Sequence, residues 1–206
     1  MPAVSKTRYV AFLRALNVPG HAIIRMPQLC QAFELAGCRK VASFSSAGNV
    51  LFETAPASAA ALFKKIRTRV GVLSGGEPGI VFRTAGDLEV VARAAPFGDL
   101  VNDRSIKLYV VFLAGPPTRK PRLPVVDEKE CLELVGVEGL HAFVVSRRRP
   151  RGIFYGFPNS FVERELGVAA TAGTGARFRR SWRARARIHE RCYAGFGIGV
   201  ATGVGS

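Results

Sequence analysis

Acidic residues are scarce in this chain, whose 206 residues contain 15 Asp and Glu against 30 Lys and Arg, for a formal net charge of +15. Long apolar runs are also missing. The longest, Leu108 to Gly115, is far shorter than the roughly 20 residues that a membrane-spanning helix needs. The N-terminus lacks the apolar stretch and small-residue cleavage site of a secretory signal. We therefore expect a cytoplasmic protein without a membrane partner.

Motifs of well-known chemistry are absent as well. The four cysteines form no CxxC pair and have no histidines at zinc-ligand spacing, so we interpret them as reduced thiols of the core or surface. The sequence contains no Walker loop, no HExxH and no GxSxG. It therefore nominates no metal ligand, no cofactor and no catalytic residue, and leaves open whether the protein is an enzyme.

What the chain has in abundance is arginine, unevenly placed. Residues 171–206 hold seven arginines against one glutamate, which leaves 23 basic and 14 acidic side chains for residues 1–170. A second cluster surrounds Pro150 and consists of Arg147, Arg148, Arg149 and Arg151. Such clusters bind the phosphates of nucleic acids or are simply solvated. Both interpretations stay open.

Hydrophobic residues make up 48% of the chain, which is typical of a globular protein. The spacing of these residues along the chain predicts an α+β fold. In the first half, strands are expected at Arg8–Leu16, Val41–Ser46, Val50–Thr54 and Gly79–Thr84, with helices at Met26–Ala36 and Ala57–Val70. This βαββαβ order is that of a ferredoxin-like unit, an antiparallel sheet with helices on one face. We assign it to residues 1–98, together with a linker helix at Asp87–Ala95.

The second half predicts a weaker copy of the same unit over residues 99–170. Strands are expected at Ile106–Ala114, Cys131–Val135 and Ala142–Ser146, and a helix at Asn159–Leu166. A proline-rich connector replaces the first helix, and no final strand is evident. We expect this second unit to be incomplete and residues 171–206 to form a poorly ordered basic tail.

Three N-terminal segments resemble the bacterial domain of unknown function 1697 family: Leu13 to Gly20, Met26-Pro27-x-Leu29, and Ser46 to Phe52. The resemblance continues in Tyr155 to Ser160 and Glu165 to Thr171. It implies a cytoplasmic protein built from two ferredoxin-like units, with no established activity. Ala15 and Pro19 replace two family glycines, and Ser46 and Ala47 replace a Gln-Ser pair.

The chain departs from the family after Thr171, where the family continues into an Arg-Asn-Trp-x-Thr-Val segment and a final helix. One choice of synonymous codons for Ala172 to Trp182, read from the third base of the first codon, spells Arg-Asn-Trp-Arg-Thr-Val. We therefore hypothesise a frameshift near Thr171, in the gene or in its sequencing. On this hypothesis the basic tail did not evolve as a nucleic-acid arm.

Polar residues gather at the predicted carboxyl end of the first strand and at the following hairpin. Alternation with Val10 and Phe12 places Arg14 on a packed face, where its charge needs either a carboxylate of a neighbouring element or an anionic ligand. Gly48 and Asn49 suit a tight turn, or complete a polar pocket beside Arg14. The candidate ligand-binding residues are Arg14, Asn17, Gly20, Ser46, Gly48 and Asn49.

Two functions follow from these features. In the first, the protein binds a small anionic ligand or nucleotide at the end of the first strand, with Arg14 as the main contact. In the second, it is a nucleic-acid-binding module that uses its basic surface. The ligand, the reaction and the oligomeric state are left open by the sequence.

The frameshift hypothesis makes a direct prediction. Resequencing the codons for Val168 to Arg187, together with an intact mass of the natural protein, is expected to restore the Arg-Asn-Trp segment. A natural protein with the mass of the printed sequence would contradict the hypothesis.

Overall fold

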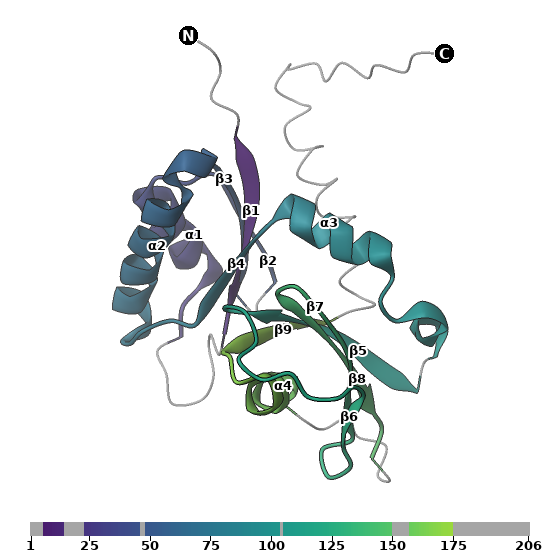
Figure 1. Ribbon diagram of the computed structural model, residues 1–206. Coiled ribbons are helices and arrows are strands. Elements are labelled where there is room, and N and C mark those ends of the chain that lie inside the picture. The colour runs from purple at the N-terminus through teal and green to yellow at the C-terminus, as the bar shows by residue number, and fades with distance from the viewer. Residues whose placement is uncertain (1–5, 15–22, 46–47, 104, 150–156, 175–206) are drawn as a thin grey trace, which may run out of the picture.

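Two antiparallel sheets, packed face to face, organise the computed structural model (Figure 1). The structure describes residues 6–14, 23–45, 48–103, 105–149 and 157–174. Two helices cover the face of the first sheet that is turned away from the second sheet, one helix covers the outer face of the second sheet, and a fourth helix packs where the sheets meet. The predicted α+β class with two ferredoxin-like sheets is confirmed.

The first unit has the predicted order of elements. They are β1 (Thr7–Leu13), α1 (Met26–Ala36), β2 (Arg39–Ser45), β3 (Asn49–Thr54), a 3₁₀ turn η1 (Pro56–Ser58), α2 (Ala59–Ser74) and β4 (Ile80–Thr84). The strand order β2-β3-β1-β4 places β1 between β3 and β4, as the ferredoxin-like fold requires. Helices α1 and α2 lie together on one face of this sheet (Figure 1).

The second unit follows α3 (Ala85–Ala94) and a 3₁₀ turn η2 (Gly98–Asn102). Its elements are β5 (Ile106–Leu113), β6 (Val125–Asp127), β7 (Leu132–Glu138), β8 (His141–Arg147), α4 (Pro158–Leu166) and β9 (Ala170–Thr174). The order β6-β7-β8-β5-β9 repeats the arrangement of the first sheet, with the short β6 added at one edge.

One expectation differs from the structure. The last strand of the second unit is present as β9, which pairs with β5 from Leu113↔Ala170 to Tyr109↔Thr174. Residues 171–174, assigned to the tail by the sequence, therefore belong to the sheet. What the second unit does lack, over the described residues 114–124, is a helix between its first two strands, because the proline-rich connector occupies that place.

Alternation along β1 explains why the two sheets share a core. Tyr9, Ala11 and Leu13 face the helices of the first unit. Val10 and Phe12 face the second sheet, where the ring of Phe12 stacks on that of Phe112 with centroids 4.1 Å apart. Both faces of β1 are buried from Tyr9 to Leu13, and over these residues its sequence is continuously apolar.

Arg83 is the exception in this apolar interface. It follows Val81 on the inner face of β4, and its side chain is only 7% exposed. Its guanidinium donates hydrogen bonds to three backbone carbonyls: Phe82 at 2.7 Å, Leu140 at 3.0 Å and Leu113. Burial lowers its pKa, an effect that nearby Asp87 opposes. Arg83 thus joins the edge of the first sheet to the end of β5 and to the β7–β8 turn.

The edge strand β4 has a second arginine along it. Arg67 of α2 donates from Nη2 to the carbonyl of Ile80 at 2.7 Å, two residues before the carbonyl of Phe82 that Arg83 binds. Two backbone acceptors of this edge are therefore satisfied by side chains and not by another strand.

We expect Arg83→Met to lower the free energy of unfolding by roughly 2–4 kcal/mol, because each buried acceptor left without a donor costs about 1–3 kcal/mol. Urea denaturation measures the change. The matched control is Arg93→Met on the exposed face of α3, where Arg93 makes an ion pair with Glu89 and a change below about 0.5 kcal/mol is expected. Equal losses in the two variants would contradict the role given to Arg83.

Candidate functional site

The candidate site lies where β1 ends, at the junction of the two units. Arg14 follows the last residue of β1, and its backbone N–H donates to the carbonyl of Gly79 at 2.7 Å. A side chain at Gly79 would place its Cβ 3.1 Å from the Cβ of Arg14, so the glycine permits this close approach. The Arg14 side chain, 37% exposed, reaches α4 of the second unit.

Glu163 of α4 is the ion-pair partner of Arg14. Its Oε1 accepts a hydrogen bond from Nη1 of Arg14 and another, of 2.8 Å, from the backbone N–H of Ala170 at the start of β9. The sequence left open whether Arg14 binds a carboxylate of a neighbouring element or an anionic ligand. In the structure it has a carboxylate partner, Glu163. The site joins β1 of one unit to α4 and β9 of the other.

Two more of the predicted site residues lie at the neighbouring strand end. In the pairing of β1 with β3, Phe12 is opposite Asn49, so Gly48 and Asn49 are beside the end of β1. Gly48 has a φ of 84°, which the turn before β3 requires and which glycine adopts without strain. The predicted residues Asn17, Gly20 and Ser46 lie outside the described residues. We call Arg14, Glu163, Gly48 and Asn49 the strand-end site.

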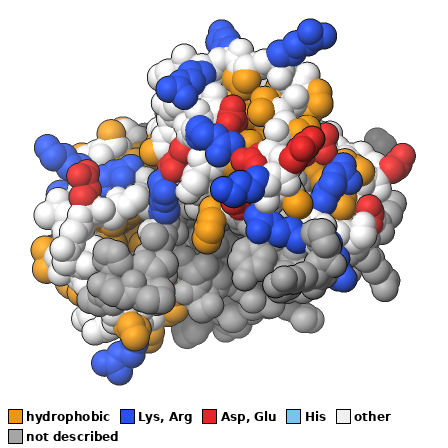
Figure 2. Space-filling view, turned by 90° about the horizontal axis from the view of Figure 1, so that it is seen from below, with side chains coloured by type: hydrophobic (Ala, Val, Ile, Leu, Met, Phe, Trp, Pro, Cys, Tyr) orange, Lys and Arg blue, Asp and Glu red, His pale blue; other side chains and the backbone are white. Residues whose placement is uncertain are grey.

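The Arg147–Arg151 cluster is partly neutralised by acidic neighbours. Arg147 binds Glu133 at 2.9 Å, and Arg149 binds Glu130 at 3.3 Å. Arg151 lies outside the described residues. Figure 2, which views the molecule from the side of α4 and β6, shows Lys and Arg side chains interspersed with Asp and Glu. Such mixed charge is typical of a solvated face.

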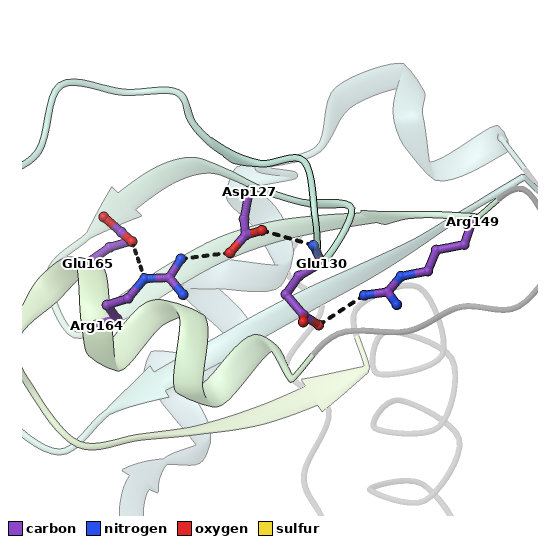
Figure 3. A network of polar contacts seen from close by, with 5 residues as sticks. All are labelled: Asp127, Glu130, Arg149, Arg164 and Glu165. Atoms are coloured by element: carbon purple, nitrogen blue, oxygen red, sulfur yellow. Dashed lines mark hydrogen bonds and ion pairs between the residues drawn. The ribbon is translucent and has the colours of Figure 1, made fainter.

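A polar network joins this region to α4 (Figure 3). Arg164 binds Asp127 at 2.8 Å and Glu165 at 2.7 Å, while Asp127 also accepts from the backbone N–H of Glu130. These hydrogen bonds lower the pKa of Asp127. The network ties α4, which carries Glu163, to β6 and its following turn.

The described part of the chain shows no grouped metal ligands, and one of its three described cysteines is buried. No three His, Cys, Asp or Glu side chains in it are grouped to hold a metal ion. Cys38 is buried, which raises its pKa to about 12 and keeps it as an unreactive thiol. None of the described helices is long and apolar enough to cross a membrane.

Comparison with known proteins places the chain in a family. A family model described as a protein of unknown function (DUF1697) matches residues 6–142, more than half of the sequence. The chain belongs to the DUF1697 family. The match covers the first unit and β5 to the beginning of β8, including Arg14, Gly48, Asn49 and Arg83, whereas Glu163 lies beyond it.

The fold of this DUF1697 protein is shared with a solved structure, that of the conserved bacterial protein SP0830 from Streptococcus pneumoniae. The two have a TM-score of 0.58 and 18% sequence identity, over 86% of this chain and 97% of that one. No curated protein matches the DUF1697 chain. At this identity the similarity establishes the fold and carries no statement on ligand or reaction.

Two residues important for the junction were not identified from the sequence, Glu163 and Arg83. Glu163 sits on an amphipathic helix, 149 positions from its partner. Arg83 had a local signal, since it is the one charged residue of the strand Ile80–Thr84 and shares a face with Val81.

His141 lies at the junction with its ring edge-on to that of Phe112, in surroundings that disfavour its charged form. Burial and the nearby positive charge of Arg83 lower its pKa, while Glu138 and Asp87 act in the opposite direction. Its Nε2 is buried without a hydrogen-bond partner among the described residues. The folded protein therefore binds a proton at His141 less readily than the unfolded chain, whose histidine has a pKa of about 6.5.

Stability is accordingly expected to fall as the pH drops below about 6.5, because the unfolded state then takes up a proton that the folded state does not. Urea unfolding from about pH 7.5 to pH 5 measures this slope. His141→Gln should flatten it. Parallel curves for the variant and the unmodified protein between about pH 6.5 and pH 5 would show that His141 is not responsible.

Proposed function

We propose that this DUF1697 protein binds a small anionic molecule, such as a phosphate-bearing nucleotide, at the strand-end site. The observation that carries the proposal is the position of Arg14 at the junction of the two units, more than one third exposed while its guanidinium is held by Glu163. A solvent-accessible guanidinium with a fixed orientation is suited to an anion, because its planar fork matches carboxylate and phosphate oxygens.

The Arg14 guanidinium can bind an anion in addition to the Glu163 carboxylate, as the chemistry of the two side chains shows. A guanidinium has five N–H donors, and the contact with Glu163 is made through Nη1. Glu163 is in turn fixed by the backbone N–H of Ala170, so it orients the arginine. A ligand either binds beside Glu163 or displaces it from Arg14.

The neighbouring strand end adds a half-buried amide, that of Asn49, next to the buried Gly48. Gly48 has no side chain, and Asn49 offers an amide that both donates and accepts hydrogen bonds. Both lie next to the end of β1 through the pairing of Phe12 with Asn49. In the DUF1697 resemblance the Arg-Asn-Trp segment begins within β9, the strand whose first residue donates to Glu163.

The second candidate, a nucleic-acid-binding module, is supported by the net charge of +15. Two features weigh against it. Arg147 and Arg149 are occupied by ion pairs with glutamates. Both faces of the first sheet are covered, one by α1 and α2 and the other by the second sheet, so bases cannot stack on it as they do on the open sheet of RNA-recognition domains.

The anion proposal is tested by calorimetry and thermal unfolding with inorganic phosphate, pyrophosphate and adenosine monophosphate as probes. Arg14→Ala is expected to weaken binding by about 10- to 100-fold, because a hydrogen bond to a charged group contributes about 1.5–3 kcal/mol. Glu163→Gln keeps an oxygen for the N–H of Ala170 but removes the competing charge, so it should bind the probes more tightly than the unmodified protein.

A purely structural ion pair gives a different pattern. In that case Arg14→Ala and Glu163→Gln both lower the melting temperature, and neither alters the response to the probes. A nucleic-acid module predicts a third pattern, in which duplex binding falls steeply with salt and is unaffected by Arg14→Ala. Either pattern would refute the proposed anion site.

A further inference from the structure

A groove of about 680 Å³ runs between α1 and α2, and it belongs neither to the strand-end site nor to the junction. The two helices cover the first sheet with their inner sides, on the side remote from the second unit (Figure 1). The groove is lined by outer residues of both helices and, at its floor, by the buried Ala32 and Ala36 of α1. It is therefore a surface feature of the first unit alone.

Two large apolar side chains protrude into solvent at this groove. Val72 of α2 is 80% exposed, and Leu35 of α1 is 60% exposed. The helices run antiparallel, as the βαββαβ order requires, and a Cβ at Gly37 after α1 would lie 3.6 Å from Leu62 near the start of α2. Leu35 and Val72, each near the carboxyl end of its helix, consequently mark opposite ends of the groove.

Positive charge lies between these apolar ends. Lys65 and Arg69, one turn apart on α2, line the groove, and α1 contributes the neutral Gln28 and Gln31. No acidic side chain is among its lining residues in the described chain. The groove thus combines two apolar anchor points with two cations, and its complement is an apolar stripe flanked by carboxylates.

We propose that this groove binds an amphipathic helix of another protein whose polar face is acidic. Charge complementarity is the argument for this occupant: Lys65 and Arg69 attract a carboxylate-bearing partner, which neutralises charge that the protein itself leaves unbalanced. Leu35 and Val72 provide the apolar contacts that a helix uses through side chains on successive turns.

Other occupants fit the groove less well. A second copy related by two-fold symmetry would bring Lys65 and Arg69 against the same cations. A nucleic acid would find no aromatic side chain for base stacking among the lining residues. A lipid surface is flat, whereas this surface is concave between two helices. The length also suits a helix, since the lining residues of α2, Lys65 to Leu73, span about 12 Å, or just over two turns.

The test uses two displayed libraries of four-turn helices with varied apolar positions, one with a Glu-rich and one with a Lys-rich polar face. The full chain is expected to select Glu-rich helices that bind at micromolar concentration. Val72→Glu should weaken the selected helices at least tenfold. The matched control Val90→Glu, at a 55% exposed valine of α3, should leave their affinity unchanged. Leu35→Glu gives a second variant should Val72→Glu unfold.

Reversing the charge of the groove tests the electrostatic part of the proposal separately, because a loss of apolar surface alone would not change which library the protein prefers. The double variant Lys65→Glu/Arg69→Glu is expected to prefer the Lys-rich library. The proposal is overturned if neither library yields a micromolar binder, if Glu-rich and Lys-rich helices are selected equally, or if Val72→Glu leaves the affinity of the selected helices unchanged.

Two further results would assign the groove to a different occupant and so overturn the proposal. In one, sedimentation shows a dimer that Val72→Glu converts to a monomer. In the other, vesicles of phosphatidylserine and phosphatidylcholine capture the protein and Val72→Glu abolishes the capture.

Discussion

The buried guanidinium of Arg83 determines how the two sheets meet. A charge placed among apolar side chains needs compensating contacts, and here these are backbone carbonyls of Leu113, Leu140 and Phe82. Those carbonyls belong to both units and lie at fixed places in the fold, namely the end of β5 and the β7–β8 turn. The requirement to satisfy one arginine therefore restricts the relative position of the sheets more than the non-directional apolar contacts around it do.

The ion pair of Arg14 and Glu163 depends on that packing. Arg14 extends from the first sheet, while Glu163 lies on a helix of the second unit and is held by the first residue of β9. Neither unit contains both groups. The strand-end site consequently exists only when the two units are packed together. A substitution at Arg83 that shifts one unit against the other therefore changes the position of Arg14 relative to Glu163, although Arg83 contacts neither residue.

Local signals predicted the first unit well and the second in part. Helix α1 has the predicted bounds, because its apolar residues recur at helical spacing between Pro27 and Gly37. Strand β9 was missed since Ala-Thr-Ala-Gly-Thr has little strand propensity, and it is a strand because β5 offers a pairing edge. For the site, alternation with Val10 and Phe12 predicted the side on which Arg14 lies. Its partner could not be predicted, because tertiary packing alone brings Glu163 there.

The two arginines along β4 have a consequence for assembly. A foreign strand that paired with this edge would first have to displace the guanidinium groups of Arg67 and Arg83 from the carbonyls of Ile80 and Phe82. Growth of the first sheet by strand addition is thereby directed to its other edge, β2. A sheet that grows from one side only can join one neighbour edge to edge, but it cannot propagate into a continuous fibre.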